Sequence, residues 1–528
     1  MKPRIVDFIL ITGILAMAST PAANASRGDF QIVYQGRTVD DLVINYMQRN
    51  HIPGLSLAIV QAPYIPRVVA YGLADTSAKT LISSNTVFNV GQITNAYTAV
   101  AVMQLKEEGK LGLEDPVTTY LPNASKEWNS IKIRHLLTHS SGLPSYNEAS
   151  GFDYSQDYNL DSIIDMVKKI PARFKAGHDT YNSATDFYLL GAIIEKSSGV
   201  SYQEYITKNQ IERAGLKYTF FPSSLESVKN ELHNGSQPFL HAEFKQNPVL
   251  INPAEPAVGY RDANNGWTAV KPNKQSATFA DSGIMASAQD ISIWDIALAG
   301  EILVKNPENR EFLYRSVKLD NGKISPGNAG WQFPGHPGLM YIKGNIPGFS
   351  TFLSRFTAPT ELLCVTLLAN KDNIRDLDVL ARQIAGAYDQ KLAAPAGSAW
   401  VVSRESPYTV NETLDRVSKV LEAKGAKVFA RIDHGANAAG AGKAMKPKQV
   451  LIVGNPAVGT DLIIAKPTVA IDLPLRIMAW EDDTGQVWAS FTDPVELGKQ
   501  YHIEGQEQVL NNMYQAVYAA VDKATTAY

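Results

Sequence analysis

The chain has 528 residues, of which 45% are hydrophobic and 19% are charged, an ordinary balance for a globular protein. A chain of this length is expected to form two or three domains and to bury a large core. Its formal net charge of −3 argues against a protein that holds nucleic acid through phosphate contacts, so we expect no nucleic-acid partner.

The first 25 residues (1–25) have the pattern of a secretory signal peptide, with a positively charged start and a mostly apolar stretch over 5–18. Residues 23–25 read Ala-Asn-Ala, which fits a cleavage site. An uncleaved anchor is the alternative, but the segment is short for a membrane span and contains Asp7. We expect a periplasmic or secreted protein that begins at Ser26 and keeps no stable membrane span.

Strands and helices are predicted in order along the next part of the chain. Segments rich in β-branched residues predict strands over 55–60 and 67–73, and later strands are predicted over 349–356 and 361–369. A helix is predicted from 92 to 108, with Gly109 as its stop, and another over 374–391. Residues 110–270 read as helices joined by loops rich in Pro, Asn and Gly. We expect the early and late strands to share one antiparallel sheet, with the helical region inserted between them.

Four separated segments in this part of the chain match one family in the same order. They are FNVGQITNAYTAVAVMQLKEEGKLGLEDP (88–116), IKIRHLLTHSSGLPSY (131–146), FYLLGAIIEKSSGVSYQEYI (187–206) and GWQFPGHPGLMYIKGNIPGFSTFLSRF (330–356). Residues 29–392 therefore resemble the beta-lactamase and DD-peptidase-like serine hydrolases, in the class C and D-alanyl-D-alanine carboxypeptidase branch. The resemblance implies an α/β (α+β) fold, in which helices flank an antiparallel sheet and a helical subdomain is inserted.

The first catalytic motif of this family, Ser-x-x-Lys at the start of a helix, falls on Gln92 and Asn95. The family serine is the nucleophile, and the lysine one turn later helps to deprotonate it. A carboxamide is not a nucleophile, and neutral Asn95 cannot act as a base. No serine in the chain is followed by a lysine three residues later, and the nearest threonine version, Thr268 with Lys271, lies in a predicted loop.

The second family motif, Tyr-x-Asn, falls on Asn182 and Ala184 when it is counted back from Leu-Leu-Gly at 189–191. In the family the tyrosine moves a proton and the asparagine binds the substrate amide. Neither group stands in its slot here. Tyr181 lies one position early, so a local shift in register would still offer a phenol.

The third family motif, His-x-Gly or Lys-x-Gly, falls on Ile342 and Gly344 when it is counted back from Pro-Gly-Phe at 347–349. Only the glycine is retained in place. Lys343 nevertheless supplies a cation one residue after the slot, and we expect it to point into the same cleft.

With every motif degenerate, we assign no catalytic residue and expect an inactive relative that binds a peptide or peptidoglycan-like ligand. The residues expected to line its cleft are Gln92, Asn95, Tyr181, Asn182, Lys343 and Gly344. Two alternatives stay open: a weak amidase or esterase that uses water and Lys343, and a structural scaffold for the C-terminal part. An open polar cleft favours binding or weak hydrolysis, whereas a cleft filled by side chains favours the scaffold. No cofactor is expected, and the sequence names no protein partner.

A second domain is predicted over 402–528, after a linker rich in small residues at 393–401. A capping box at 409–412 begins a helix that stops at Gly425. Predicted strands follow over 427–432, 449–455, 475–482 and 486–491, and a last helix covers 505–523. The phrases QVLIVGNPAVGT and IDLPLRIMAWEDDTGQVWASFTDP resemble the domain of unknown function 302, which implies a small α+β fold and no reaction.

Two histidines and the single cysteine have ordinary structural explanations. His434, beside Asp433, could bind a metal or ligand, but a lone histidine is more often structural, and no metal site is expected. His139 is expected to cap or brace a helix end beside the cleft. Cys364 lies in an apolar run and is expected to be a buried strand residue.

The signal-peptide pattern predicts that the exported protein begins at Ser26. Sequencing the N-terminus of protein recovered from outside the cytoplasm checks this prediction. A cytoplasmic protein that retains Met1 would contradict it.

Overall fold

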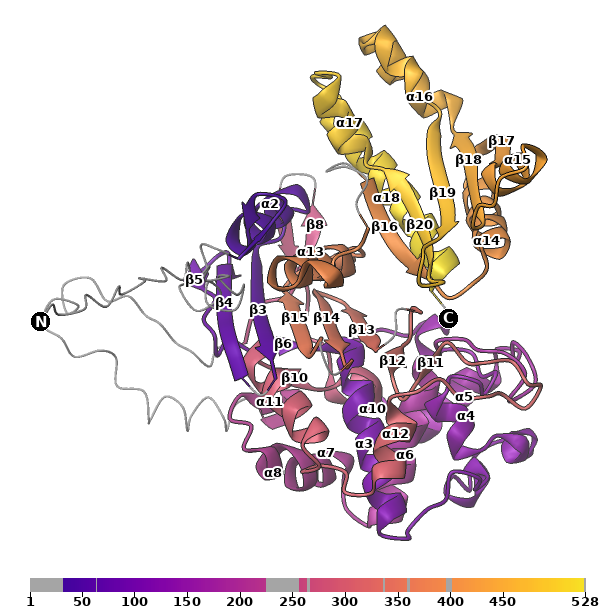
Figure 1. Ribbon diagram of the computed structural model, residues 1–528. Coiled ribbons are helices and arrows are strands. Elements are labelled where there is room, and N and C mark those ends of the chain that lie inside the picture. Colours follow the sequence, from indigo (N-terminus) through magenta and orange to yellow (C-terminus); the bar gives the residue numbers. More distant parts are fainter. Residues whose placement is uncertain are drawn as a thin grey trace, which may run out of the picture.

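The computed structural model describes residues 32–62, 64–224, 256–263, 266–335, 338–358, 361–395 and 401–526. The predicted signal peptide, the predicted start at Ser26 and part of the predicted linker lie outside these ranges. Two bodies are seen in Figure 1: a large one built around a central sheet, and a smaller one formed by the C-terminal residues. The fold class expected from the sequence is confirmed.

The large body is organised by an antiparallel sheet of eight strands in the order β11-β12-β13-β14-β15-β3-β4-β5. Its strands are β3 (Gly54–Gln61), β4 (Tyr64–Asp75), β5 (Thr80–Leu81), β11 (Gly327–Asn328), β12 (Trp331–Gln332), β13 (Leu339–Ile346), β14 (Phe349–Phe356) and β15 (Leu363–Ala369). The late strand β15 pairs with the early strand β3, for example Val365 with Ile59. The predicted joining of early and late strands in one sheet is therefore confirmed.

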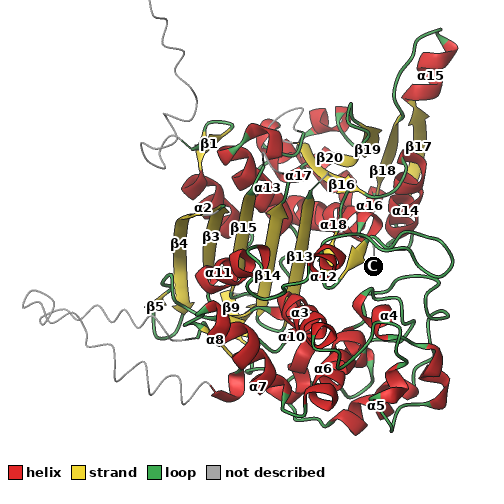
Figure 2. Ribbon diagram, turned by 60° about the horizontal axis from the view of Figure 1, so that its bottom comes forward, coloured by secondary structure: helices red, strands yellow, loops and turns green. Residues whose placement is uncertain are grey.

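Each face of this sheet buries its own apolar side chains. On one face, α2 (Val39–Arg49) and α13 (Leu377–Tyr388) pack against alternate strand residues such as Leu57 and Phe352. On the other face lies the helical region, whose helices include α3 (Thr94–Glu107), α10 (Gln275–Ser282) and α11 (Ala288–Ala299). Figure 2 shows β4, β3, β15, β14 and β13 side by side, in the order of the strand pairing.

The inserted region consists mostly of short helices and small paired strands. The other helices are α4 (Ile133–Leu137), α5 (Leu160–Lys168), α6 (Ala184–Ser198), α7 (Tyr202–Ile206), α8 (Glu212–Ala214) and α12 (Pro307–Leu313). The small strands outside the large sheet are β1 (Val33–Tyr34), β2 (Arg37–Thr38), β6 (Phe88–Asn89), β7 (Thr219–Phe220), β8 (Tyr260–Ala263), β9 (Gly266–Ala269) and β10 (Met285–Ala286).

Helix α3 lies at the centre of this region, with every residue from Thr94 to Leu105 buried. A helix that is covered on all sides cannot show the one-sided apolar pattern of a surface helix. The helix ends where the sequence predicts, since Gly109 has a φ of 70° and its N–H bonds back to the Lys106 carbonyl. Cys364 is buried in β15, which confirms its expected place.

The C-terminal body contains an antiparallel sheet of five strands in the order β16-β20-β19-β18-β17. These are β16 (Val401–Ser406), β17 (Lys427–Asp433), β18 (Lys448–Gly454), β19 (Leu475–Glu481) and β20 (Val487–Thr492). Its helices are α14 (Val410–Glu422), α15 (His434–Gly440), α16 (Pro456–Ala465), α17 (Pro494–Gln500) and α18 (Glu507–Thr525). One face buries Leu451 and Ile477 against Leu414 of α14 and Tyr518 of α18.

Strand β16 is one of the elements that the sequence pattern did not predict, together with β13 and α16. Its residues follow the small-residue linker, and the strand exists because it pairs with β20 along its full length, from Val401 with Thr492 to Ser406 with Val487. That partner lies far away in the sequence, so local composition carries no sign of it.

Within the described ranges, no helix is both long enough and apolar enough to cross a membrane.

Candidate functional site

The backbone around Gln92 lies directly against strand β13. Gln92 sits in a single helical turn, Gly91–Ile93, between β6 and α3. A Cβ atom on Gly91 would lie 3.2 Å from the Gly344 Cα, and one on Gly344 would lie 2.8 Å from the Val90 carbonyl oxygen. Gly91 also has a φ of 54°, which side chains disfavour. Glycine at both positions therefore allows the turn to approach the strand closely, which explains why Gly344 is the retained residue of its motif.

The Gln92 side chain is hydrogen-bonded to strand β13 and lies near Asp281 of helix α10. Its Oε1 atom accepts a hydrogen bond of 2.8 Å from the Asn345 backbone N–H. The same carboxamide lies close enough to the Asp281 carboxyl to oppose the rise in its pKa. Because its oxygen is already bonded to the strand, Gln92 occupies the position where a ligand carbonyl would meet the Asn345 N–H.

Asp281 is the site residue that the sequence analysis missed. Its side chain is 1% exposed, and its Oδ2 atom has no hydrogen-bond partner among the described residues. Burial raises the pKa of Asp281 to about 7, with a further increase from the Asp186 carboxylate, while the nearby polar side chains of Ser282 and Gln92 act in the opposite direction. The only sequence signal was an acidic residue in the otherwise small and apolar run FADSGIM.

Helix α10 presents Asp281 because the helix is bent three residues from its end. Phe279 interrupts it with a φ of 40° and a ψ of −123°. Its ring packs against Tyr188 and Tyr202, and a Cβ atom on Gly191 of α6 would lie 2.6 Å from that ring. The conformation is unusual for an aromatic residue and is held in place by this packing.

Asn95 lies one turn after Gln92, in the protein interior. Its side chain is 2% exposed, and Gly330 at the β11–β12 turn packs so closely that a Cβ atom there would lie 2.8 Å from the Asn95 Cβ. Its Oδ1 atom has no partner within the described ranges. The first-motif slots thus form a neutral amide pair, one half-exposed and one buried.

The second-motif residues lie at the start of helix α6. Ala184 is buried, and its N–H donates to the Ser145 hydroxyl, whereas Asn182 is exposed. Tyr181 donates from its hydroxyl to Glu148 and stacks under the Arg173 guanidinium at 3.8 Å. Its pKa is raised to about 12 by burial and by the Glu148 hydrogen bond. In the described part of the chain no hydrogen bond links Tyr181 or Asn182 to Gln92.

The structure corrects the expected orientation of Lys343. Side chains alternate along a strand, so Ile342 enters the core on the helical side while Tyr341 enters the core on the α13 side. Lys343 shares the face of Tyr341, and its Nζ atom lies 2.9 Å from Asp522 Oδ1 in the C-terminal body. A residue one position after the motif slot must face the other way, so Lys343 does not lie beside Gln92.

A cavity of about 880 Å³ adjoins the Gln92 turn. Asn89 lines it and accepts a hydrogen bond from the Gly91 N–H at 2.9 Å, so the cavity and the turn share a wall. The side-chain amide of Gln275 contributes two buried atoms, Nε2 and Oε1, and Asn273 contributes a buried Oδ1, all without partners among the described residues. The lining also contains apolar side chains such as Val258, Met285 and Phe349, and the charged side chains of Asp157, Lys271 and Lys274.

The two histidines singled out from the sequence lie in different environments. His139 Nδ1 lies 3.0 Å from Asp186 Oδ2 in the first turn of α6, and both side chains are buried, so His139 braces that helix start as expected. His434 is exposed at the first position of α15, which is capped by the Asp433 carboxylate accepting from the Ala436 N–H. Across the described ranges, no group of three or more His, Cys, Asp and Glu side chains is placed to hold a metal ion.

Comparison with known proteins supports both resemblances drawn from the sequence. Residues 39–389 match the Beta-lactamase family model, and residues 402–523 match the Domain of unknown function DUF302. Protein flp of Staphylococcus aureus (strain MW2) is 23% identical over 337 residues, which make up 63% of this chain and 62% of that protein. Penicillin-binding protein 4* of Bacillus subtilis (strain 168) is 26% identical over 313 residues, 57% of this chain and 65% of that protein.

The chain thus spans less than two thirds of the length of these relatives. Among solved structures, a class C beta-lactamase superposes with a TM-score of 0.51 at 22% identity, covering 68% of this chain and 96% of that chain. At this identity the similarity is one of fold.

The raised pKa of Asp281 predicts a specific pH dependence of stability. As pH rises from 3.8 to about 7, the unfolded chain loses this proton while the folded chain keeps it, so the folded state is progressively disfavoured. The variant Asp281→Asn has no carboxyl at this position and so does not lose stability in this way. The difference in free energy of unfolding between the variant and the original protein should therefore increase, in favour of the variant, by on the order of 3 kcal/mol between pH 4 and pH 8. Calorimetric melting at both pH values measures the change.

An exposed carboxylate provides the control for this comparison. Asp165→Asn on α5 should show the same pH profile as the original protein. If Asp281→Asn also follows that profile, the buried carboxyl does not titrate as described.

Proposed function

We propose that this chain, which belongs to the beta-lactamase family over residues 39–389, is an exported and catalytically inactive member that binds a peptide or cell-wall-like ligand. The observation that carries the proposal is the Gln92 carboxamide, which stands in the nucleophile slot with its oxygen on the Asn345 N–H at 2.8 Å.

Loss of catalysis follows from the chemistry of the two first-motif slots. The Gln92 carboxamide has no hydroxyl that could attack a substrate carbonyl. The buried Asn95 amide does not accept a proton near neutral pH, so it cannot act as the base. Removing either member of such a pair typically lowers turnover by about a million-fold, and a second loss adds little. The Gln92 oxygen also occupies a backbone donor that would otherwise polarise a bound carbonyl.

Ligand binding is supported by the cavity beside this turn. Its volume of about 880 Å³ falls within the range of small-molecule and short-peptide sites, roughly 300–1,000 Å³. Buried amide atoms without partners cost free energy unless a ligand satisfies them. The amides of Gln275 and Asn273 offer both donors and acceptors, which complement the N–H and C=O groups of a peptide better than those of an apolar ligand.

The contacts between the two bodies favour a second candidate, in which the hydrolase fold serves as a scaffold for the C-terminal domain. Arg49 forms two hydrogen bonds to Asp493. Asp376 accepts hydrogen bonds from the hydroxyls of Tyr46 and Tyr514, each at 2.6 Å.

The third candidate, a weak amidase or esterase, loses the cation that Lys343 was expected to supply. Asp281 is then the acid–base group whose pKa the Gln92 amide influences.

Inactivity is tested by covalent labelling. The protein incubated with a fluorescent penicillin or a fluorophosphonate should show no adduct by intact mass, because no activated hydroxyl stands at the start of α3. The double variant Gln92→Ser with Asn95→Lys restores a nucleophile and a base and should acylate slowly, with Gln92→Ser alone as its control. A stoichiometric adduct on a serine or threonine of the unaltered protein would refute inactivity.

Binding is tested by calorimetric titration with a soluble N-acetylmuramyl pentapeptide. The variant Gln275→Ala should weaken binding by roughly 5- to 100-fold, since it removes hydrogen bonds from a buried amide. The matched control Gln500→Ala, at an exposed end of α17, should leave the affinity unchanged. Failure to bind at millimolar concentration, or equal affinities for both variants, would count against this ligand site and favour the scaffold.

A further inference from the structure

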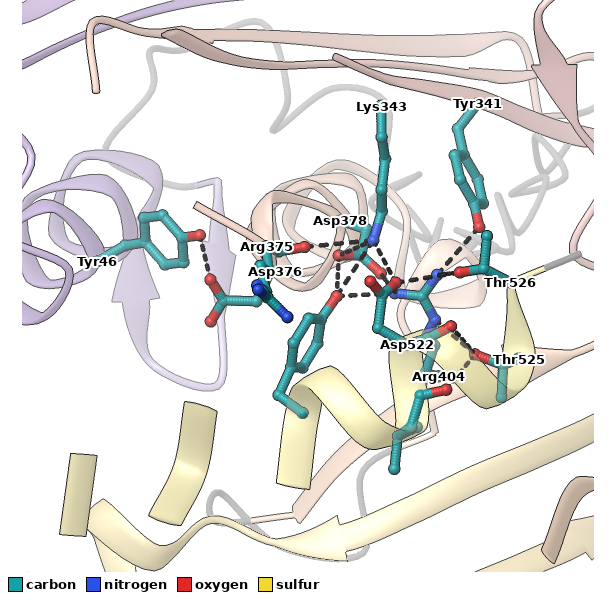
Figure 3. Close-up of polar contacts among 12 residues, drawn as sticks. Tyr46, Tyr341, Lys343, Arg375, Asp376, Asp378, Arg404, Asp522, Thr525 and Thr526 are labelled. Atoms are coloured by element: carbon teal, nitrogen blue, oxygen red, sulfur yellow. Dashed lines mark hydrogen bonds and ion pairs between the residues drawn. The ribbon is translucent and has the colours of Figure 1, made fainter. Parts of the chain in front are cut away.

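Strand β13 is joined to the C-terminal domain by a partly buried cluster of charges. Lys343 extends from β13 toward two carboxylates, with Nζ 2.9 Å from Asp522 Oδ1 and 3.2 Å from Asp378 Oδ1 (Figure 3). Its Nζ atom also donates to the Arg375 carbonyl at 3.2 Å and to the Tyr518 hydroxyl at 3.3 Å. Asp378 belongs to α13 of the large domain, whereas Asp522 and Tyr518 belong to α18.

A second cation from the C-terminal domain closes the cluster. Arg404 of β16 is 3% exposed, and its Nη1 atom lies 2.7 Å from Asp378 Oδ2 and 2.6 Å from Asp522 Oδ1. Its Nη2 atom donates to the hydroxyl of Tyr341, also on β13, at 3.1 Å. The two carboxylates are therefore shared between a lysine of one domain and an arginine of the other (Figure 3).

The paired cations affect the acidity of Asp522 in the direction expected for such a cluster. Burial alone would raise the pKa of Asp522, but the positive charges of Arg404 and Lys343 lower this pKa to about 2. Removing one member would leave a charge in a site with little water, which is strongly unfavourable. The cluster thus holds its geometry as a unit.

The same strand carries the backbone group that meets Gln92. Tyr341, Lys343 and Asn345 are alternate residues of β13, so their backbone N–H groups point to the same side of the strand. On that side Tyr341 pairs with Gln332 of β12, and beyond this pair the Asn345 N–H meets the Gln92 carboxamide. Two of these three residues have their side chains in the cluster.

We propose that the C-terminal domain sets the position of strand β13 at the candidate site, with Arg404 and Asp522 as positioning residues that act through Lys343 and Tyr341. The domain thereby keeps the Asn345 N–H against Gln92. This inference deepens the proposed function. Its consequence for a ligand, that the C-terminal domain governs access to the Asn345 N–H, rests on the proposed function, whereas the positioning of β13 does not.

The test is hydrogen–deuterium exchange of the full chain without any ligand, which separates it from the binding experiment. In Arg404→Met, peptides that cover 339–349 should exchange about tenfold faster or more, because β13 loses its anchoring cluster. Arg49→Met is the matched control: it removes another ion pair between the domains, to Asp493, whose residues lie outside β13. That variant should leave exchange over 339–349 within about twofold of the original protein.

A uniform increase in exchange across the domain border in both variants would show that the cluster only joins the domains, and would overturn the proposal. Unchanged exchange over 339–349 in a folded Arg404→Met protein would overturn it as well. If Arg404→Met does not fold, Asp522→Asn decides the question, since it preserves the volume of the side chain and removes only its charge.

Discussion

The close approach of the Gln92 turn to strand β13 is the constraint on which the candidate site depends. Gly91 and Gly344 leave room for it, and the Gln92 carboxamide then accepts a hydrogen bond from the Asn345 N–H of β13. A serine in this position would have left the Asn345 N–H free for a ligand, whereas glutamine is long enough to reach it. Glutamine thus stands where the family has its nucleophile and also occupies a neighbouring backbone donor, and a binding role is proposed on these two grounds.

Buried polar groups lie on both sides of this turn, and they differ in how well they are satisfied. Asp281 and the amides of Gln275 and Asn273 retain atoms without partners among the described residues, whereas the Lys343 cluster is fully paired. Unpaired buried atoms lower the stability of the free protein and favour a ligand that satisfies them. Paired buried charges instead fix one arrangement, because any displacement separates them. A ligand is proposed to bind beside the side chains of Asp281, Gln275 and Asn273. The Lys343 cluster is proposed to hold strand β13 in position.

The C-terminal domain has its own core, yet it is not an isolated appendage. Leu414, Ile477 and Tyr518 belong to that core, while the Tyr518 hydroxyl also donates to Asp378 of the large domain. Helix α18 therefore serves two purposes: it covers the five-stranded sheet and it carries polar groups to the face of α13. This arrangement explains why the chain can combine two recognisable sequence families and still behave as one structural unit at β13.

The sequence by itself determined the family, many of the strands and helices, and the chemical identity of the motif slots, because matched segments and local patterns depend on neighbouring residues. The ends of α3 and α14 lie where caps and stop residues predict them, and β14 spans the residues predicted for it. Only the tertiary structure decided that Lys343 faces the C-terminal domain, that β16 is a strand, and that Asp281 and the Gln275 cavity adjoin Gln92. Each of these depends on residues far apart in the chain: a strand partner, the alternation of a particular register, or a carboxyl buried by other elements. Such pairings are fixed by packing and desolvation in the folded protein, and no short stretch of sequence records them.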